Sequence, residues 1–378
     1  MTDQASKAGD NQDAVLAPQP LVSRRTLLAG AGALGLSVPF AFAAHRAGAG
    51  PNAAFPTGLP DTAICKVAGN APADVAAGPL KKISFAWNAG ASCLIGVTVA
   101  KEKGFFAKHG LDVDLVNFAG STDQLLETLA TGKSDAAVGM ALRWLKPLEQ
   151  GFDVKIVGST HGGCLRLLAP ASSGIKDLTD LKGKTIAVSD MNSPGKNFFS
   201  VRLKKAGIDP VTEVEFKQFP GPLLRVAVEK GEAHALTDND PLTYLWIKDG
   251  QFIEVSSNLT GEYEHRVCCI IGVRGSLLRD DKPAAAAIVR ALIEAAEFTH
   301  HNPGEAADTY LPYSAGKATK EDITALAKYH SHGHHPLGAD LKKELALYAE
   351  ELKLVNVFKP STDINKYAER IYADVLTS

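Results

Sequence analysis

The sequence lacks an excess of charge of either sign. Its 378 residues include 40 Lys and Arg against 42 Asp and Glu, which gives a formal net charge of −2. Nucleic-acid binding calls for a basic face, so this balance gives no support for a nucleic-acid partner. Hydrophobic residues at 45% and charged residues at 22% are typical of an ordinary globular protein.

Familiar catalytic motifs are also absent. The chain contains no G-x-S-x-G, no phosphate-binding loop and no H-E-x-x-H, and no pattern of carboxylates assigns an acid and a base. We therefore expect a protein that is not an enzyme and that carries no cofactor.

Cysteine is scarce and irregularly spaced, which excludes a small disulfide scaffold. The odd count leaves at least one thiol unpaired or bound to another group. The five cysteines are Cys65, Cys93, Cys164, Cys268 and Cys269.

Long apolar runs are lacking except near the N-terminus. There, Arg24 and Arg25 precede an apolar, glycine-diluted stretch that ends in Ala41-Phe42-Ala43. This order resembles a twin-arginine export signal, and we expect cleavage just after Ala43. The alternative is an N-terminal transmembrane helix, but such a helix needs about 20 strongly apolar residues. The sequence therefore predicts a signal peptide at 1–43, a disordered linker at 44–79, and a mature protein in the periplasm.

From Lys81 onward, strand-like and helix-like segments alternate, which predicts two mainly parallel sheets with helices on both faces. Crossings between the two sheets near 165–169 and 267–272 would make a hinged clamp. We expect a first lobe of residues 80–167 plus 270–378 and a second lobe of residues 168–269. The predicted strands are 83–87, 111–118, 136–140, 154–158, 185–188, 214–218, 235–237 and 267–273, and the predicted helices include 94–109, 142–150, 193–206, 223–230 and 283–301.

Four stretches in a fixed order carry a family resemblance: "AKEKGFFAKHGLDVDLV" (100–116), "LATGKSDAAVG" (129–139), "GIKDLTDLKGKTIAV" (174–188) and "VEKGEAHALTDNDP" (228–241). The order resembles the periplasmic solute-binding proteins of ABC importers, in the family that includes nitrate-, taurine-, alkanesulfonate- and thiamine-precursor-binding proteins. The resemblance implies a type II periplasmic-binding-protein fold whose lobes close around a small molecule. It also implies an ABC permease in the inner membrane as partner, and we expect a monomer.

The same family is similar to a pyrimidine-precursor synthase that uses pyridoxal phosphate and iron. The run of consecutive cysteines typical of that enzyme is absent, because only Cys268 and Cys269 are adjacent. Synthesis or binding of such a precursor remains an alternative, as does an exported metal or redox protein.

Two predicted helix starts are candidates for binding an anion. Ser121 and Thr122 begin one helix, and Ser193 and Lys196 begin another. A helix N-terminus presents unpaired N–H groups and a partial positive charge, which suits a sulfonate, nitrate or carboxylate. The alternative for each is ordinary helix capping.

Further candidate ligand contacts follow predicted strands, where ligands lie in open α/β sheets. The aromatic ring of Trp144 could stack on an organic solute, and Arg143 could pair with an acid. The alternatives are core packing for the tryptophan and a solvated salt bridge for the arginine. The remaining candidates are Asn88, Ser92, Cys93, His161, Asp238 and Asp240.

Histidine and cysteine gather at the two predicted crossings. "THGGCLR" holds His161 and Cys164, and "EHRVCCI" holds His265, Cys268 and Cys269. A disulfide from Cys164 to Cys268 or Cys269, buried free thiols, and a metal or thiol-reactive ligand all remain open.

A second histidine group, "HSHGHH", contains His330, His332, His334 and His335. These imidazoles could capture a transition metal or add pH sensitivity. The alternative is an exposed loop between C-terminal helices that has no specific role.

Overall fold

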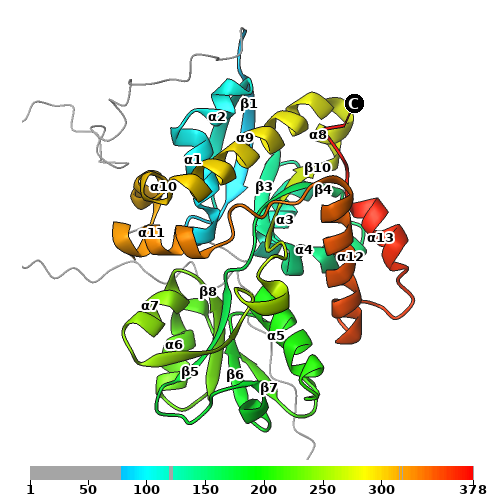
Figure 1. Cartoon of the computed structure of the whole chain (residues 1–378). Helices are drawn as coiled ribbons and strands as arrows, with labels where there is room; N and C mark the ends of the chain where they lie inside the picture. Colours follow the sequence, from blue (N-terminus) through cyan, green and yellow to red (C-terminus); the bar gives the residue numbers. More distant parts are fainter. Residues whose placement is uncertain (1–77, 119–121, 315, 317, 378) are drawn as a thin grey trace, which may run out of the picture. The chain divides into compact units, whose positions relative to one another are not determined.

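The computed structural model describes residues 78–118, 122–314, 316 and 318–377, all of which belong to the unit Cys65–Ser378 (Figure 1). The predicted signal at 1–43, nearly all of the predicted linker and Ser121 lie outside the described residues, as does the side chain of Thr122. Within the described part, no helix is both long enough and apolar enough to cross a membrane.

Two five-stranded sheets carry the fold. The strand order is β2-β1-β3-β10-β4 in the first sheet and β7-β6-β8-β5-β9 in the second. The strands are β1 (Lys81–Trp87), β2 (Leu111–Asn117), β3 (Ala136–Met140), β4 (Val154–His161), β5 (Leu165–Pro170), β6 (Thr185–Val188), β7 (Glu215–Gln218), β8 (Ala235–Asn239), β9 (Phe252–Ser257) and β10 (Cys269–Arg274).

Each sheet is mainly parallel, as predicted, but is mixed because one of its five strands runs opposite to the other four. In the first sheet β1 is parallel to β2 and β3, whereas β10 is antiparallel to β3 and β4. In the second sheet β6 is parallel to β7 and β8, whereas β5 is antiparallel to β8 and β9. The antiparallel pairs arise because β10 and β5 are the strands that enter each sheet directly from the other one.

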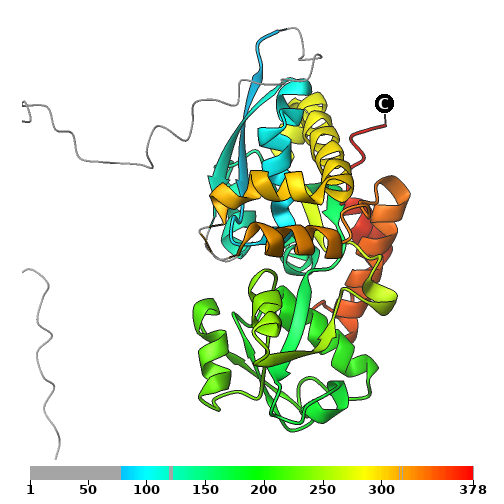
Figure 2. The same ribbon diagram turned by 60° about the vertical axis from the view of Figure 1, so that its left-hand side comes forward.

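Helices cover both sheets. One face of the first sheet is covered by α1 and α9, which lie side by side in Figures 1 and 2, and α3 packs on β1, β3, β4 and β10. The α-helices are α1 (Ile95–Glu102), α2 (Phe105–Lys108), α3 (Thr122–Ala130), α4 (Ala141–Glu149), α5 (Pro194–Lys205), α6 (Leu224–Glu229), α7 (Leu242–Lys248), α8 (Gly275–Asp280), α9 (Lys282–His301), α10 (Pro303–Tyr310), α11 (Lys320–Tyr329), α12 (Gly338–Leu354) and α13 (Ile364–Ile371).

Local sequence explains where several elements begin and end. Ser193 caps α5 by accepting a hydrogen bond from the backbone N–H of Lys196, and Pro194 occupies the first turn. Gly104 has a φ of 76°, which is left-handed backbone. The single helix predicted for residues 94–109 is therefore wrong, because Gly104 separates α1 from α2.

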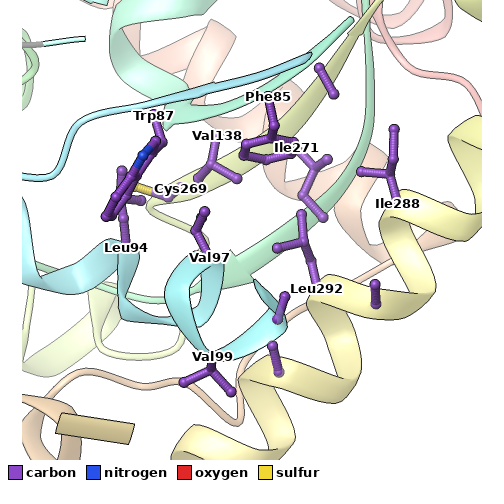
Figure 3. Close-up of a cluster of buried hydrophobic side chains, with 14 of the residues drawn as sticks. Phe85, Trp87, Leu94, Val97, Val99, Val138, Cys269, Ile271, Ile288 and Leu292 are labelled. Carbon is purple, nitrogen blue, oxygen red and sulfur yellow. The ribbon is translucent and has the colours of Figure 1, made fainter. Parts of the chain in front are cut away.

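The core of the first sheet lies between its strands and the pair α1 and α9. Figure 3 shows Ile288 and Leu292 of α9 turned toward the sheet, with Val97 of α1 beside them. At one end of this apolar layer, Cys269 lies among the labelled side chains near Trp87. One end of the hydrophobic core therefore contains a thiol.

The chain passes between the sheets twice, between β4 and β5 and between β9 and β10. The two passages touch backbone to backbone. A Cβ on Gly163 would lie 2.1 Å from the carbonyl oxygen of Asn258, and one on Gly162 would lie 3.0 Å from the carbonyl oxygen of Glu264. Only glycine allows this approach. All of β5 lies in the second sheet, and the predicted division into lobes of residues 80–167 plus 270–378 and residues 168–269 stays a prediction.

Candidate functional site

Four cysteines and one histidine gather where the two passages meet, and we call them the thiol cluster. His161 ends β4, Cys269 begins β10, and Cys93 lies in the 3-10 helix Ser92–Leu94 that follows β1. Cys164 and Cys268 lie in the two linking segments. The exposed fraction of each side chain is 5% or less.

The geometry of the cluster follows from the sheet. His161 and Cys269 are directly opposite each other on the antiparallel strands β4 and β10, so their side chains share a face. The sulfur atoms of Cys93 and Cys269 and a ring nitrogen of His161 all lie within 4.8 Å of one another.

A disulfide from Cys164 to Cys268 or Cys269, one of the alternatives that the sequence leaves open, is not formed. Cys164 Sγ lies 3.5 Å from Cys268 Sγ, whereas a disulfide bond is about 2.05 Å long. Cys93, Cys164, Cys268 and Cys269 are free, buried thiols. The structure therefore contradicts the disulfide and leaves the buried thiols and the metal or thiol-reactive ligand open.

Mutual hydrogen bonds set the ionisation of these thiols. The thiol of Cys164 donates to its neighbours, which lowers the pKa of Cys93 and that of Cys268 well below the ordinary value. The hydrogen bond to Cys268 raises the pKa of Cys164 itself. Burial is the largest influence and acts against a charge on His161, but the interactions with Cys93, Cys268 and the backbone of Gly162 together outweigh it and raise the pKa of the imidazole.

Several polar atoms around the cluster are buried without a hydrogen-bond partner. Both ring nitrogens of His161 are in this state, as are Nδ1 of His330, Nε2 of His332 and Oγ of Ser92. Buried polar atoms in proteins are bonded in about 90% or more of cases, so such a group needs an explanation. The ring centroid of His161 lies 6.1 Å from that of His330 and 5.5 Å from that of His332.

The histidine group near the C-terminus is therefore not a plain exposed loop. His330 and His332 are 2% and 1% exposed, so the exposed-loop interpretation is wrong for these two residues. Burial lowers the pKa of His332 well below its usual value. His334 and His335 instead bind the carboxylates Glu344 and Glu297, at 3.1 Å and 2.7 Å.

His265 does not join the thiol cluster, and its predicted approach to the cysteines is wrong. Its side chain is exposed and lines a groove of about 610 Å³ together with His334 and His335. The ring centroids of His265 and His334 are 6.1 Å apart. The histidines thus form one buried group and one solvent-facing group.

Asp240 lies at the centre of a buried ion network beside the cluster. Its carboxylate accepts hydrogen bonds from Nε and Nη2 of Arg166 at 3.0 Å and 3.1 Å, and from the hydroxyl of Thr243 at 2.7 Å. Nε2 of His330 lies 3.0 Å from its Oδ2. Burial opposes the charge of this carboxylate, but His330 and Arg166 together lower the pKa of Asp240.

Arg143 and Trp144 both lie on α4. The guanidinium of Arg143 binds Asp190, which follows β6 of the second sheet, through two hydrogen bonds of 2.7 Å and 2.5 Å. Trp144 is fully buried in the core. Its ring fills the space where Gly139 and Gly272 have no Cβ, as the core-packing alternative predicts.

The N-terminus of α5 holds two further candidates. The hydroxyl of Ser193 accepts from the backbone N–H of Lys196 at 3.2 Å, and burial lowers the pKa of Lys196. A Cβ on Gly195 would lie 2.5 Å from Oγ1 of Thr237, and this hydroxyl is buried without a hydrogen-bond partner. The helix start thus faces an unbonded hydroxyl in the middle of β8.

Two candidates accept a hydrogen bond from a backbone N–H close to them in the sequence. The side-chain oxygen of Asn88 accepts from the backbone N–H of Gly90 at 2.8 Å, and that of Asp238 accepts from the backbone N–H of Asn239 at 2.9 Å. Of the candidates that the structure describes with side chains, it brings Ser92, Cys93 and His161 to the cluster or its edge. It places Asp240 in the adjoining ion network, and Ser193 and Lys196 at the start of α5.

A family model described as NMT1/THI5 like matches residues 92–306. Among curated proteins, the chain is similar to the nitrate import ATP-binding protein NrtC of a Synechocystis strain, with 25% identity over 225 residues, 53% of this chain and 32% of that protein. The chain spans about a third of the length of the curated relatives that it matches.

Two solved structures resemble the described fold. The alkanesulfonate-binding protein SsuA of Xanthomonas axonopodis pv. citri, bound to MOPS, is 18% identical with a TM-score of 0.64, covering 77% of this chain and 99% of that one. The periplasmic nitrate-binding protein NrtA of Synechocystis is 15% identical with a TM-score of 0.64, covering 79% and 87%. These matches confirm the predicted periplasmic-binding-protein fold.

Proposed function

We propose, from the premise that this chain belongs to the NMT1/THI5-like family, that it is the solute-binding component of an ABC importer and captures a small anion or organic acid. The observation that carries the proposal is the fold. Two mixed sheets are joined by two passages, and the structural match covers 99% of an alkanesulfonate-binding protein. In such a fold the two sheets close around the solute by rotation at the passages.

The N-terminus of α5 supports an anionic solute. Unpaired N–H groups and the helix dipole attract negative charge at this position. The buried hydroxyl of Thr237 beside Gly195 has no partner and so can donate to a sulfonate, nitrate or carboxylate. The side chain of Lys196, partly buried on the first turn, adds a cation at the same end of the helix.

The remaining parts of the proposal concern location and partner. The twin-arginine-like signal at 1–43 would deliver the mature protein to the periplasm, where a permease of the inner membrane would receive it as a monomer. The matched structures bear the names of binding proteins, which supports binding without catalysis.

An added negative charge at the helix cap tests the anion site. Asp caps helices as well as Ser does, so Ser193→Asp should leave the melting temperature unchanged or higher. The added carboxylate should weaken binding of the anion at least tenfold, about 1.4 kcal/mol. The measurement is calorimetry with nitrate, taurine and an alkanesulfonate, after a thermal-shift screen selects the tightest of them.

The matched control is Ser172→Asp, which places the same charge on an exposed loop of the second sheet. This variant should bind as the unaltered protein does. Equal affinity of both variants would remove the start of α5 from the solute site. Failure of every anion to raise the melting temperature would reject an anionic solute altogether.

A further inference from the structure

We propose that Cys93, His161 and Cys269 bind a single thiophilic metal ion of the Zn²⁺ or Cu⁺ class. This inference goes beyond the proposed solute and does not depend on it. It rests on three features of the thiol cluster, which are the spacing of its donor atoms, the rigidity of their supports and the unpaired state of the imidazole.

The spacing is close to that of a bound ion. Zinc lies about 2.3 Å from sulfur and about 2.0 Å from nitrogen in proteins, so ligand atoms around one tetrahedral ion are roughly 3.5–3.8 Å apart. The three donor atoms already lie within 4.8 Å of one another. Shifts of about 1 Å or less, within reach of side-chain rotation, would close the site.

The three donor residues lie on three separate elements, which are two strands of the first sheet and the short helix that follows β1. Cys269 and His161 are paired across β10 and β4, and the backbone N–H of Cys268 donates to the carbonyl of His161 at 2.9 Å. Cys93 comes from the 3-10 helix Ser92–Leu94, which continues directly into α1. A site on paired strands and a helix holds its donors in place before the ion arrives.

The imidazole has no competing role. His161 is 0% exposed, and neither of its ring nitrogens has a hydrogen-bond partner among the residues that the structure describes. A buried polar group left without a partner destabilises the folded state. Coordination of one nitrogen would remove most of this cost.

The surrounding thiols fit the same role. Cys164 lies in the same buried cluster, with its Sγ 3.5 Å from that of Cys268, so it can supply a fourth sulfur. Two thiolates and one imidazole favour soft or borderline cations over Mg²⁺ or Ca²⁺, which prefer oxygen ligands. Trp87 and Leu94 belong to the same apolar cluster as these cysteines and shield the site from water.

The test uses reduced, metal-free protein with its own N-terminus, no histidine tag and Cys65→Ser as background. Titration with Co²⁺, a spectroscopic substitute for Zn²⁺, should give one equivalent of a complex with thiolate-to-cobalt charge-transfer absorption. Zn²⁺ should displace the cobalt, and Cu⁺ should compete with a chromophoric chelator at the same stoichiometry. Cys93→Ser and Cys269→Ser should each abolish the charge-transfer band or weaken binding at least a hundredfold.

Two histidine variants distinguish loss of the proposed ligand from a general effect of replacing a histidine. His161→Gln should weaken Co²⁺ binding at least tenfold. His301→Gln, at an exposed position at the end of α9, should leave binding unchanged. Equal binding by these two variants would remove His161 from the site.

X-ray absorption of the zinc complex of the otherwise unaltered protein keeps the proposal testable even where a variant does not fold. A first shell of sulfur with at least one imidazole nitrogen is expected. Oxygen and nitrogen ligands alone, or no one-to-one complex, would overturn the proposal. Solute binding is measured separately on metal-free protein, so the loss of one proposal leaves the other standing.

Discussion

At the scale of single residues, Asp240 carries the most buried charge beside the candidate site. Its side chain is 0% exposed, and its oxygens are shared among Arg166, Thr243 and His330. His330 follows α11, whereas Asp240 follows β8 of the second sheet, so this ion pair joins distant parts of the chain. The contacts favour a structural role for Asp240.

Asp240→Asn should lower the free energy of unfolding at pH 7 by about 3–5 kcal/mol, because it leaves Arg166 as a buried charge without its main partner. The pKa of Asp240 is lowered in the folded state, so its contribution is complete above the unfolded pKa of about 3.9 and is lost as the pH falls through the folded pKa. Urea unfolding between pH 7 and pH 3 measures both effects.

The control for this prediction is Asp308→Asn, which breaks an exposed pair with Lys320. Surface pairs contribute about 0–1 kcal/mol, so this change should be small. The free energies of unfolding of the Asp240 variant and the unaltered protein should converge as the pH falls. A difference that stays constant down to pH 3 would contradict the assignment of the charge to Asp240.

At the scale of elements, the packing of helix α4 against β3 and β10 depends on two glycines that have no side chain. Built Cβ atoms on Gly272 of β10 and Gly139 of β3 would each lie 2.5 Å from the ring of Trp144. Cβ atoms do not approach this closely, so the indole fixes how α4 lies on the sheet. Because Arg143 precedes Trp144 on the same helix, this packing also sets where its guanidinium lies.

Gly272→Ala should therefore destabilise the protein by about 1–3 kcal/mol through overpacking. The matched control is Gly96→Ala in α1, where a Cβ would meet nothing within 4 Å. This control should be neutral or should stabilise the protein by about 0.5–1 kcal/mol. Thermal and urea unfolding compare the two, and equal stabilities would contradict the packing account.

The elements also show which features a sequence reveals. The strands predicted at 136–140 and 185–188 match β3 and β6, because their apolar residues and flanking turns are local signals. The reversed direction of β5 in the second sheet and of β10 in the first is not predicted from the sequence. It depends on contacts between distant parts of the chain. Gly104 is a visible break signal inside the helix predicted for residues 94–109.

The candidate site was predictable in part for the same reason. Cys93 and His161 were identified because loops at strand ends gather in this fold class. His330 and His332 form a dense group in the sequence, but the exposed-loop interpretation is wrong for them. Their burial depends on Asp240 and on the passage holding His161, and a single sequence does not reveal such long-range contacts.

At the scale of the whole described unit, side-chain contacts join the two sheets in addition to the covalent passages. Arg143 of α4 holds Asp190 of the second sheet, and Nδ2 of Asn197 donates to the carbonyl of Leu142 at 3.1 Å. Lys248 of α7 binds Asp322 at the start of α11 at 2.5 Å. These contacts hold the conformation that the structure presents.

Arg143→Lys should loosen this arrangement, because lysine cannot reproduce the two-pronged contact with a carboxylate. We expect backbone amides near the start of α5, residues 190–197, to exchange with solvent about tenfold faster, which corresponds to about 1.4 kcal/mol. Hydrogen-exchange mass spectrometry measures this rate. Arg279→Lys, which alters the exposed pair with Asp153, should leave the same amides unchanged. Equal exchange in both variants would show that Arg143 does not join the two sheets.

The missing side chains of Gly162 and Gly163 have a consequence for any group held beside them. Since the two passages already touch through their main chains, their separation is set by atoms that have no rotamers to change. If the sheets rotate apart to release a solute, as the proposed function requires, these passages would serve as the pivot, and His161 and Cys269 beside them would keep their spacing. A solute between the sheets would then be exchanged in every cycle, whereas the proposed ion would stay bound at the pivot.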